Sequence, residues 1–102
     1  MLAAMAADHQ QATATVQIDD GRVRVTEWRF QPGEATGHHR HEYDYVVVPI
    51  TTGELTLVEN GTARVSPISA GHAYARPAGV EHDVINESVR EVVFVEIELL
   101  EA

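Results

Sequence analysis

The sequence lacks cysteine and lysine, and each absence limits what the chain can do. Without cysteine among its 102 residues, the chain has no disulfide, thiolate metal site, iron–sulfur cluster or cysteine nucleophile. Its 7 basic residues, all of them arginine, stand against 16 acidic residues, for a formal net charge of −9. Because phosphate binding depends on clustered positive charge, we expect neither nucleic acid nor an anionic membrane surface as a partner.

Long hydrophobic runs are absent as well. No segment approaches the ~18 apolar residues that a membrane helix needs. The opening stretch MLAAMAAD is apolar but short and has no basic residue, so it does not resemble a secretory signal, and we expect a cytoplasmic protein. Residues 1–12 are rich in alanine and glutamine, but an isolated helix that short is marginal in water. We therefore expect a flexible N-terminal arm at 1–12 and a single domain at 13–102.

From residue 13 onwards the sequence is typical of β-strands, because apolar and polar residues alternate or β-branched residues cluster. Strands are predicted at 13–19, 22–30, 45–50, 53–59, 62–68, 72–76, 82–86 and 90–99. The pair Asn60-Gly61 predicts a tight hairpin, and Pro49, which has no N–H to donate, predicts a strand end or a bulge. With no helix indicated after residue 12, the fold class is all-β, a sandwich or a barrel.

Several residues within these strands are expected to have structural roles. Trp28 and Phe30, two residues apart, are expected to pack in the core or at a dimer interface. Glu96 and Glu98 alternate with apolar neighbours, which is the pattern of a half-exposed strand. Asn86 is expected to tie down a loop.

The six histidines are unevenly distributed, since three of them fall within the segment GHHRH. In an extended strand, residues two apart point to the same face, so His39 and His41 present two imidazoles side by side. His82 completes a three-histidine site if the fold brings its strand opposite theirs. Neutral imidazole binds Zn, Cu, Fe and Ni, so this group is a candidate metal site. His38 and His72 are expected on the surface.

Two sequence motifs resemble those of small single-domain cupins, which are double-stranded β-helix proteins. The second cupin motif is complete, with Gly71, Pro77-Ala78-Gly79, His82 and Asn86 at the family's spacing. The first motif has Gly33, His39, His41 and Gly53 but lacks its glutamate, since the two candidate positions are Tyr45 and Val46. The stretches HEYDYVVVPITTGEL, YARPAGVEHDVIN and VFVEIEL are similar to a subgroup with members linked by name to β-alanine degradation.

The resemblance implies a fold, a metal and an assembly. The fold would be an all-β, double-stranded β-helix (jelly-roll) barrel over residues 13–102, and the assembly a homodimer. Cupins hold their metal with two histidines and a glutamate of the first motif and the histidine of the second. By transfer, this chain keeps His39, His41 and His82 as ligands of a divalent transition metal, with Fe, Mn, Ni and Zn all open. Some cupin dioxygenases use a three-histidine iron site, so the missing glutamate does not by itself abolish metal binding.

Tyr45 and Arg76 are the candidate catalytic residues. Tyr45 has the same strand parity as His39 and His41, so its phenol is expected inside the barrel. There it is either a weak fourth metal ligand or a hydrogen-bond donor to a metal-bound water or substrate. Arg76 either clamps a substrate carboxylate through its two-pronged guanidinium or forms a surface ion pair. Asp44 and Glu42 are off-parity and are not expected at the site.

Three functional hypotheses follow from these residues. In the first, the metal acts on a carbonyl or on dioxygen, and the protein is a metal-dependent dioxygenase, decarboxylase or isomerase of a small carboxylate or carbonyl compound. In the second, the same pocket binds or senses a small ligand without turnover, with or without a metal. In the third, the barrel has lost its metal, and Tyr45 fills the place of the missing glutamate. Fold alone does not choose among them.

Overall fold

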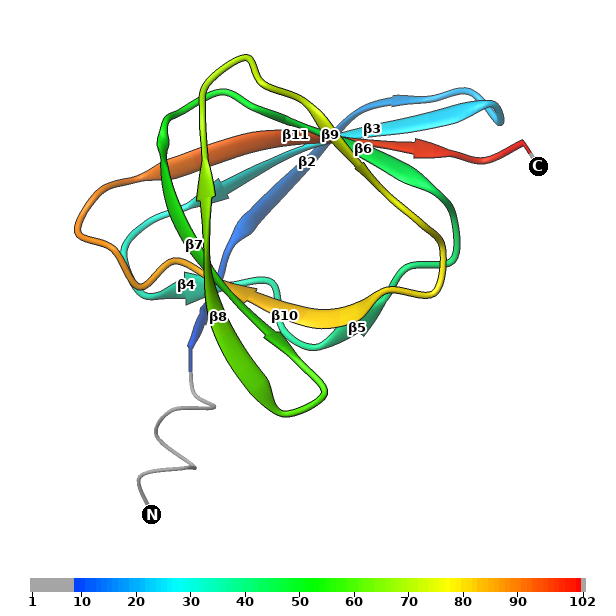
Figure 1. The fold of residues 1–102 in the computed structure, drawn as a ribbon. Helices are drawn as coiled ribbons and strands as arrows, with labels where there is room; N and C mark the ends of the chain where they lie inside the picture. Colours follow the sequence, from blue (N-terminus) through cyan, green and yellow to red (C-terminus); the bar gives the residue numbers. More distant parts are fainter. Residues whose placement is uncertain (1–8, 102) are drawn as a thin grey trace.

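The computed structural model describes residues 9–101, which form two β-sheets closed into a barrel (Figure 1). The five-stranded sheet contains, in spatial order, β2 (Thr13–Asp19), β3 (Val23–Phe30), β11 (Val92–Leu99), β6 (Tyr45–Pro49) and β9 (Tyr74–Arg76). The six-stranded sheet contains β1 (Gln10–Gln11), β4 (Glu34–Ala35), β10 (Glu81–Ile85), β7 (Gly53–Glu59) and β8 (Thr62–Ile68), with β5 (His39–Arg40) also paired to β10. The all-β, jelly-roll fold predicted from the sequence is confirmed.

The structure differs from the predicted organisation at the N-terminal end. Gln10 and Gln11 form β1, which pairs in parallel with β4, and Ala12 is only 3% exposed. The backbone N–H of Ala12 donates to the carbonyl of Ala35. Residues 10–12 therefore belong to the barrel and not to the predicted arm, because they complete a sheet edge and fill the core. The preceding part of that arm, residues 1–8, lies outside the described residues. Within residues 9–101 no helix is long and apolar enough to cross a membrane.

The predicted turn and strand end are both present. Asn60 and Gly61 have φ values of 52° and 75°, the two positive angles of a type I′ turn, and they join β7 to β8. Pro49 is the last residue of β6, so its missing N–H interrupts no further pairing. β6 lies between β11 and β9, and its alternate residues are buried.

The core lies between the two sheets and is centred on aromatic contacts. The rings of Phe30 on β3 and Phe94 on β11 lie 5.5 Å apart, and the ring of Trp28 is 6.2 Å from that of Phe30. Leu55 and Leu57 of β7 face them from the other sheet. Trp28 and Phe30 are thus core residues, one of the two roles predicted for them.

Asn86 ties down the loop between β10 and β11, as predicted. Its side chain is fully buried, and its amide donates to the carbonyl oxygens of Phe30 at 3.1 Å and Arg90 at 2.8 Å. Its own carbonyl oxygen accepts hydrogen bonds from the backbone N–H and the hydroxyl of Ser88. One amide therefore fixes the loop against the end of β3.

Asn86→Ala is expected to destabilise the protein by about 2–4 kcal/mol, because it leaves buried backbone carbonyls without a donor. Asn86→Asp keeps the shape but removes the donor, so a loss of similar size is expected from it. Chemical denaturation monitored by circular dichroism measures both, with the exposed Thr62→Ala on β8 as the control. A loss below about 1 kcal/mol in both variants would show that the loop does not depend on this amide.

Candidate metal centre

Strand pairing brings together histidines that are far apart in the sequence. β5 and β10 run antiparallel, and in their register His39 lies directly opposite His82. Directly opposite residues on paired strands project from the same face, with Cβ atoms about 4.5–5.5 Å apart. The opposed strands that the sequence analysis requires for a three-histidine site are therefore present.

His41 lies just beyond β5 and is held by two further backbone bonds. Its N–H donates to the carbonyl of Val80, and its own carbonyl accepts from the N–H of Gly79, both at 2.8 Å. Its ring stacks on that of Tyr45, with centroids 3.8 Å apart and an interplanar angle of 15°. The backbone and the tyrosine together aim this imidazole at the other two.

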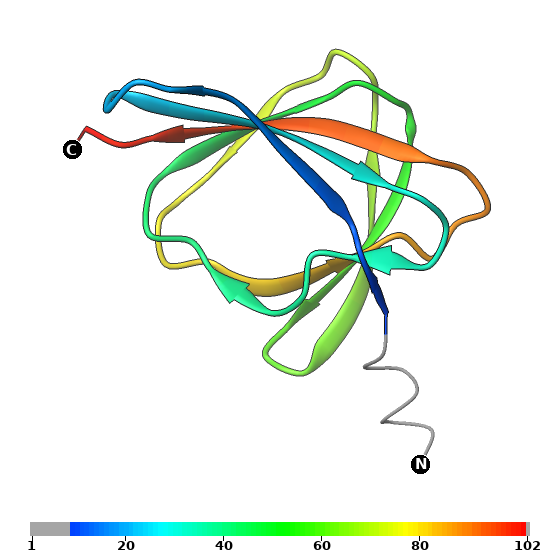
Figure 2. The ribbon, with the colours of Figure 1, turned by 180° about the vertical axis from the view of Figure 1, so that it is seen from behind.

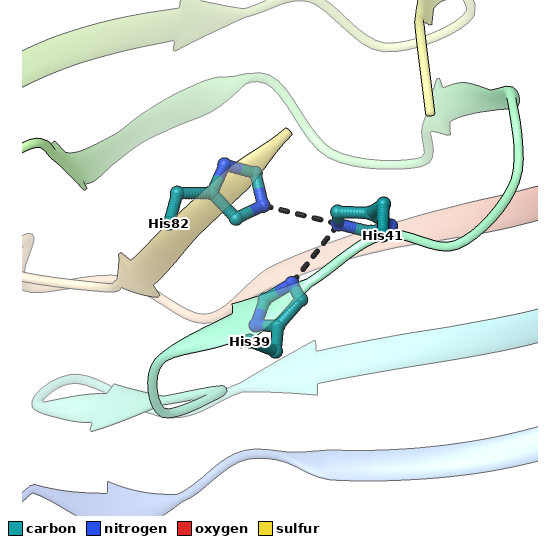
Figure 3. A group of neighbouring side chains, drawn as sticks. All are labelled: His39, His41 and His82. Carbon is teal, nitrogen blue, oxygen red and sulfur yellow. Dashed lines mark hydrogen bonds between the residues drawn. The ribbon is translucent and has the colours of Figure 1, made fainter. Parts of the chain in front are cut away.

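The Nε2 atoms of the three histidines converge on one point (Figure 3). His41 Nε2 lies 3.0 Å from His39 Nε2 and 3.1 Å from His82 Nε2. A neutral ring nitrogen has either one proton or one lone pair, so His41 Nε2 cannot form a full hydrogen bond with both neighbours. Nitrogens that bind one ion at ~2.0–2.1 Å are about 2.9–3.4 Å apart at angles near 90–109°. Both separations from His41 fall in this range, and the three donor atoms lie within 4.8 Å of one another, so the group could hold a metal ion.

The polar contacts behind His39 fix its orientation. Its Nδ1–H donates to the carbonyl of Gly37 at 2.8 Å, and the hydroxyl of Thr36 lies 3.3 Å from the same nitrogen. Gly37 has a φ of 85°, which favours glycine. With its proton on Nδ1, His39 turns the lone pair of Nε2 toward the other imidazoles, which is the tautomer a metal ligand needs.

Burial keeps two of the imidazoles neutral. It lowers the pKa of His41 and of His82 from 6.5 to about 4, and the neighbouring His39 lowers both further. At neutral pH both rings therefore carry a free lone pair, as metal binding requires. The three histidine donor atoms lie within 4.8 Å of one another. Among the described residues, no carboxylate belongs to this group of possible metal ligands.

A cavity of about 30 Å³ opens beside the histidines and is lined by both sheets. Such a volume has room for about two water molecules, or for one small group of a ligand. His39 and His82 line it from the strands of the six-stranded sheet. The five-stranded sheet contributes the polar or aromatic side chains of Trp28, Tyr45, Tyr74, Arg76 and Glu96.

Tyr45 enters the barrel, as its strand parity predicts. Its side chain lines the cavity and is 2% exposed. Burial raises the pKa of its phenol above the usual range, so the hydroxyl keeps its proton. Among the described residues this buried hydroxyl has no hydrogen-bond partner, and it is therefore available to a ligand in the cavity. Asp44 instead uses its carboxylate to accept from the N–H of Ala78, and Glu42 is exposed.

Arg76 lines the same cavity from the edge strand β9. Its side chain is 25% exposed, and its guanidinium donates to Glu59 at 3.4 Å, which leaves further N–H groups unengaged by that contact. The predicted ion pair is thus present, at the cavity, and the other predicted role of Arg76, a clamp on a substrate carboxylate, stays a prediction. His38 and His72 are exposed, as predicted, and His38 pairs with Glu81 at 2.6 Å.

Glu96 is the cavity residue that the sequence analysis missed. Its alternation with apolar neighbours indicates a half-exposed strand, but in the barrel its side chain lies on the cavity face of β11. Burial and the nearby Glu98 raise its pKa from 4.5 to about 7, and a hydrogen bond from Trp28 opposes that shift. To recognise Glu96 as a cavity residue, one must know that β11 pairs with β3, the strand of Trp28. A single sequence does not supply this strand order.

Comparisons with known proteins agree with this geometry. A family model described as Cupin domain matches residues 26–98. The β-alanine degradation protein BauB of Pseudomonas aeruginosa is 60% identical over 89 residues, which are 87% of this chain and 94% of BauB. The crystal structure of a cupin domain from Bordetella pertussis is 56% identical, covers 93% of this chain and 98% of its own, and superposes with a TM-score of 0.89. The polyketide cyclase RemF of Streptomyces resistomycificus shares the fold, with 22% identity, coverage of 92% and 70%, and a TM-score of 0.71.

The raised pKa of Glu96 predicts a pH-dependent cost in stability. Between its unfolded value of 4.5 and its folded value of about 7, the folded state binds the extra proton, so stability falls as pH rises through this range. Glu96→Gln does not titrate. We expect this variant, without metal, to be more stable than wild type by about 1–3 kcal/mol at pH 8, with the difference shrinking toward pH 5.

Urea unfolding at pH 5 and pH 8 in the presence of a chelator measures this difference. Glu54→Gln, at an exposed glutamate of β7, is the matched control and should show no such pH dependence. A stability gap between Glu96→Gln and wild type that is equal at both pH values would mean that Glu96 does not titrate between them.

Proposed function

This chain belongs to the cupin family, and from that premise we propose that it is a metal-dependent cupin acting on a small carboxylate- or carbonyl-containing metabolite. The metal would be one divalent transition ion, with Fe, Mn, Ni and Zn all compatible with three imidazoles. Its ligands would be His39, His41 and His82. The observation that carries the proposal is the convergence of their Nε2 atoms on one point.

The bound ion would supply Lewis-acid or oxygen-binding chemistry. The chain's own residues supply the rest. The guanidinium of Arg76 would hold a carboxylate of the ligand, because its planar N–H groups match the two carboxylate oxygens. The hydroxyl of Tyr45, protonated and without a partner among the described residues, would donate a hydrogen bond to the ligand or to a water beside it.

The size of the cavity and the relative's name both support a small substrate. A volume of about 30 Å³ excludes a large metabolite from the space next to the histidines. BauB, which shares 60% of its aligned residues with this chain, is named for β-alanine degradation. A role in the breakdown of a short amino acid or of its acid products is consistent with both, and it is part of the proposal.

The homodimer predicted from the sequence, in which a second copy of the chain is the partner, stays a prediction. In a single copy the edge strands are β2 and β9 of the five-stranded sheet and β1 and β8 of the six-stranded sheet, and β2 is exposed along its whole length. Exposed edges are normally covered or paired, which supports a homodimer. The cytoplasmic location likewise stays a prediction.

Metal content is the first test. Protein purified without an affinity tag or chelator is expected to carry about one equivalent of a transition metal by elemental analysis. His82→Ala and His39→Ala should lose it, because each removes one of three ligands. His72→Ala, at an exposed histidine, should keep it. If wild type binds no metal and takes up none of Fe, Mn, Ni or Zn, the metal-dependent function is wrong.

Tyr45→Phe separates the two predicted roles of the tyrosine. Because the hydroxyl is buried without a partner among the described residues, its removal should leave stability unchanged or raise it by about 1 kcal/mol. If Tyr45 is a hydrogen-bond donor, the variant keeps its full metal content and binds short acids more weakly in calorimetry. Loss of the metal would identify Tyr45 as a ligand instead.

A further inference from the structure

Glu96 occupies the centre of the sheet that faces the histidines across the cavity. In the register of the five-stranded sheet it lies opposite Thr26 of β3 on one side and Val47 of β6 on the other. Both neighbours are buried. The indole N–H of Trp28, two residues further along β3, lies close enough to lower the pKa of this carboxyl. The carboxyl therefore sits in a mostly apolar row.

The histidines and Glu96 come from opposite walls of one cavity. His39 and His82 belong to strands of the six-stranded sheet, whereas Glu96 belongs to the five-stranded sheet, and all three line the same space. Figures 1 and 2 show the two sheets on opposite sides of the interior, with β11 and β6 across from β10 and β5. A small ligand bound at the imidazoles would therefore have its far end toward Glu96.

The other charged or titratable groups of the wall already have a charged partner or are neutral, although Arg76 keeps further N–H groups that its partner does not engage. Glu98, on the same strand, pairs with Arg24 of β3 at 3.5 Å. On β9, Arg76 is paired with Glu59 of the opposite sheet. The two tyrosines at the cavity, Tyr45 and Tyr74, have pKa values raised by burial and stay protonated.

Glu96 is left with unused hydrogen-bonding capacity. Within residues 9–101 it forms no ion pair with an arginine or histidine. A carboxylate has about four acceptor sites, and the only neighbour that lowers the pKa of this one is the indole of Trp28. A partly buried carboxyl with so few partners is costly, and such groups gather at functional sites.

We propose that Glu96 is a ligand-binding residue, which binds the hydrogen-bond donor of a short carboxylic acid whose carboxylate lies toward the histidines and Arg76. This inference rests on the proposed function and specifies its substrate class: a small acid with a hydroxyl or an amine a few bonds from the carboxylate. Acids of the same length without such a donor would bind more weakly, because they leave the carboxyl of Glu96 buried without a partner.

A purely structural role does not require an ionisable group at this position. A glutamine has the same shape and would accept the hydrogen bond of Trp28 equally well. The titration of Glu96 near neutrality, with a pKa of about 7, supports the binding role, because the ionised form is available to an ammonium group at slightly alkaline pH. Affinity for an amine-bearing acid should then rise from pH 6 to pH 8, while affinity for the matching acid without a donor should not.

The test compares three acids of equal chain length on protein loaded with one equivalent of zinc. Propionate, 3-hydroxypropionate and β-alanine differ only in the group at carbon 3, and calorimetry measures their affinities at pH 6 and pH 8. The two donor-bearing acids are expected to bind roughly tenfold more tightly than propionate at pH 8. Glu96→Leu should abolish this preference for both acids. Glu96→Gln should abolish it for β-alanine only and remove the pH dependence.

Glu98→Gln is the matched control, because it removes a carboxylate from the same strand that already has an arginine partner. It should keep the preference at pH 8, above the pKa of Glu96 in both proteins, because the loss of Glu98 only lowers that pKa. Equal affinities of the three acids in wild type, no binding of any of them, or a preference that survives in both Glu96 variants would each overturn the inference.

Zinc content measured on the same samples separates the two proposals. Retained zinc without a donor preference overturns the role of Glu96 and leaves the metal centre standing. If zinc is not retained and Fe, Mn and Ni are not taken up either, the metal-dependent function fails. The same three acids are then titrated into the metal-free protein, and the role of Glu96 fails too unless a preference that depends on Glu96 persists.

Discussion

The antiparallel pairing of β5 with β10 is the interaction on which the site depends. It places His39 opposite His82, and its continuation through the backbone of Val80 and Gly79 fixes His41. β5 has only two residues, so this register is not secured by a long ladder of its own. It is secured because β10 also pairs with β7, which in turn forms a long hairpin with β8. The positions of the histidines thus depend on the pairing of the whole six-stranded sheet.

The site concentrates polar groups where the fold otherwise buries apolar ones. Two buried imidazoles, a buried phenol and a carboxyl lie in or beside one small cavity, and each would cost free energy if left without a partner. The protein lowers this cost by keeping the groups uncharged: burial lowers the pKa of His41 and raises that of Tyr45. Contacts such as the packing of Phe30 on Phe94 supply the compensating stability.

The sequence predicts the barrel and the histidines well because both have local signals. Asn60-Gly61 specifies its own turn, and the two-residue spacing of His39 and His41 specifies a shared face. The cupin motifs then connect His82 to them. Glu96 has no such signal, because alternation along β11 shows that one face differs from the other without showing which face is inside. The β1 strand was missed for a related reason, since two glutamines carry no strand pattern and pair only because β4 offers an edge.

The two walls of the cavity divide the chemistry between them. The six-stranded sheet carries the histidines, within motifs that resemble those of cupins in general. The five-stranded sheet carries Tyr45, Arg76 and Glu96, and Tyr45 is one of the two candidate positions for the missing glutamate. A metal held by the three histidines alone would lack the negative charge that a carboxylate ligand supplies. A bound divalent ion would then be neutralised by an anionic substrate more than by the protein, and this favours a small carboxylate in the cavity.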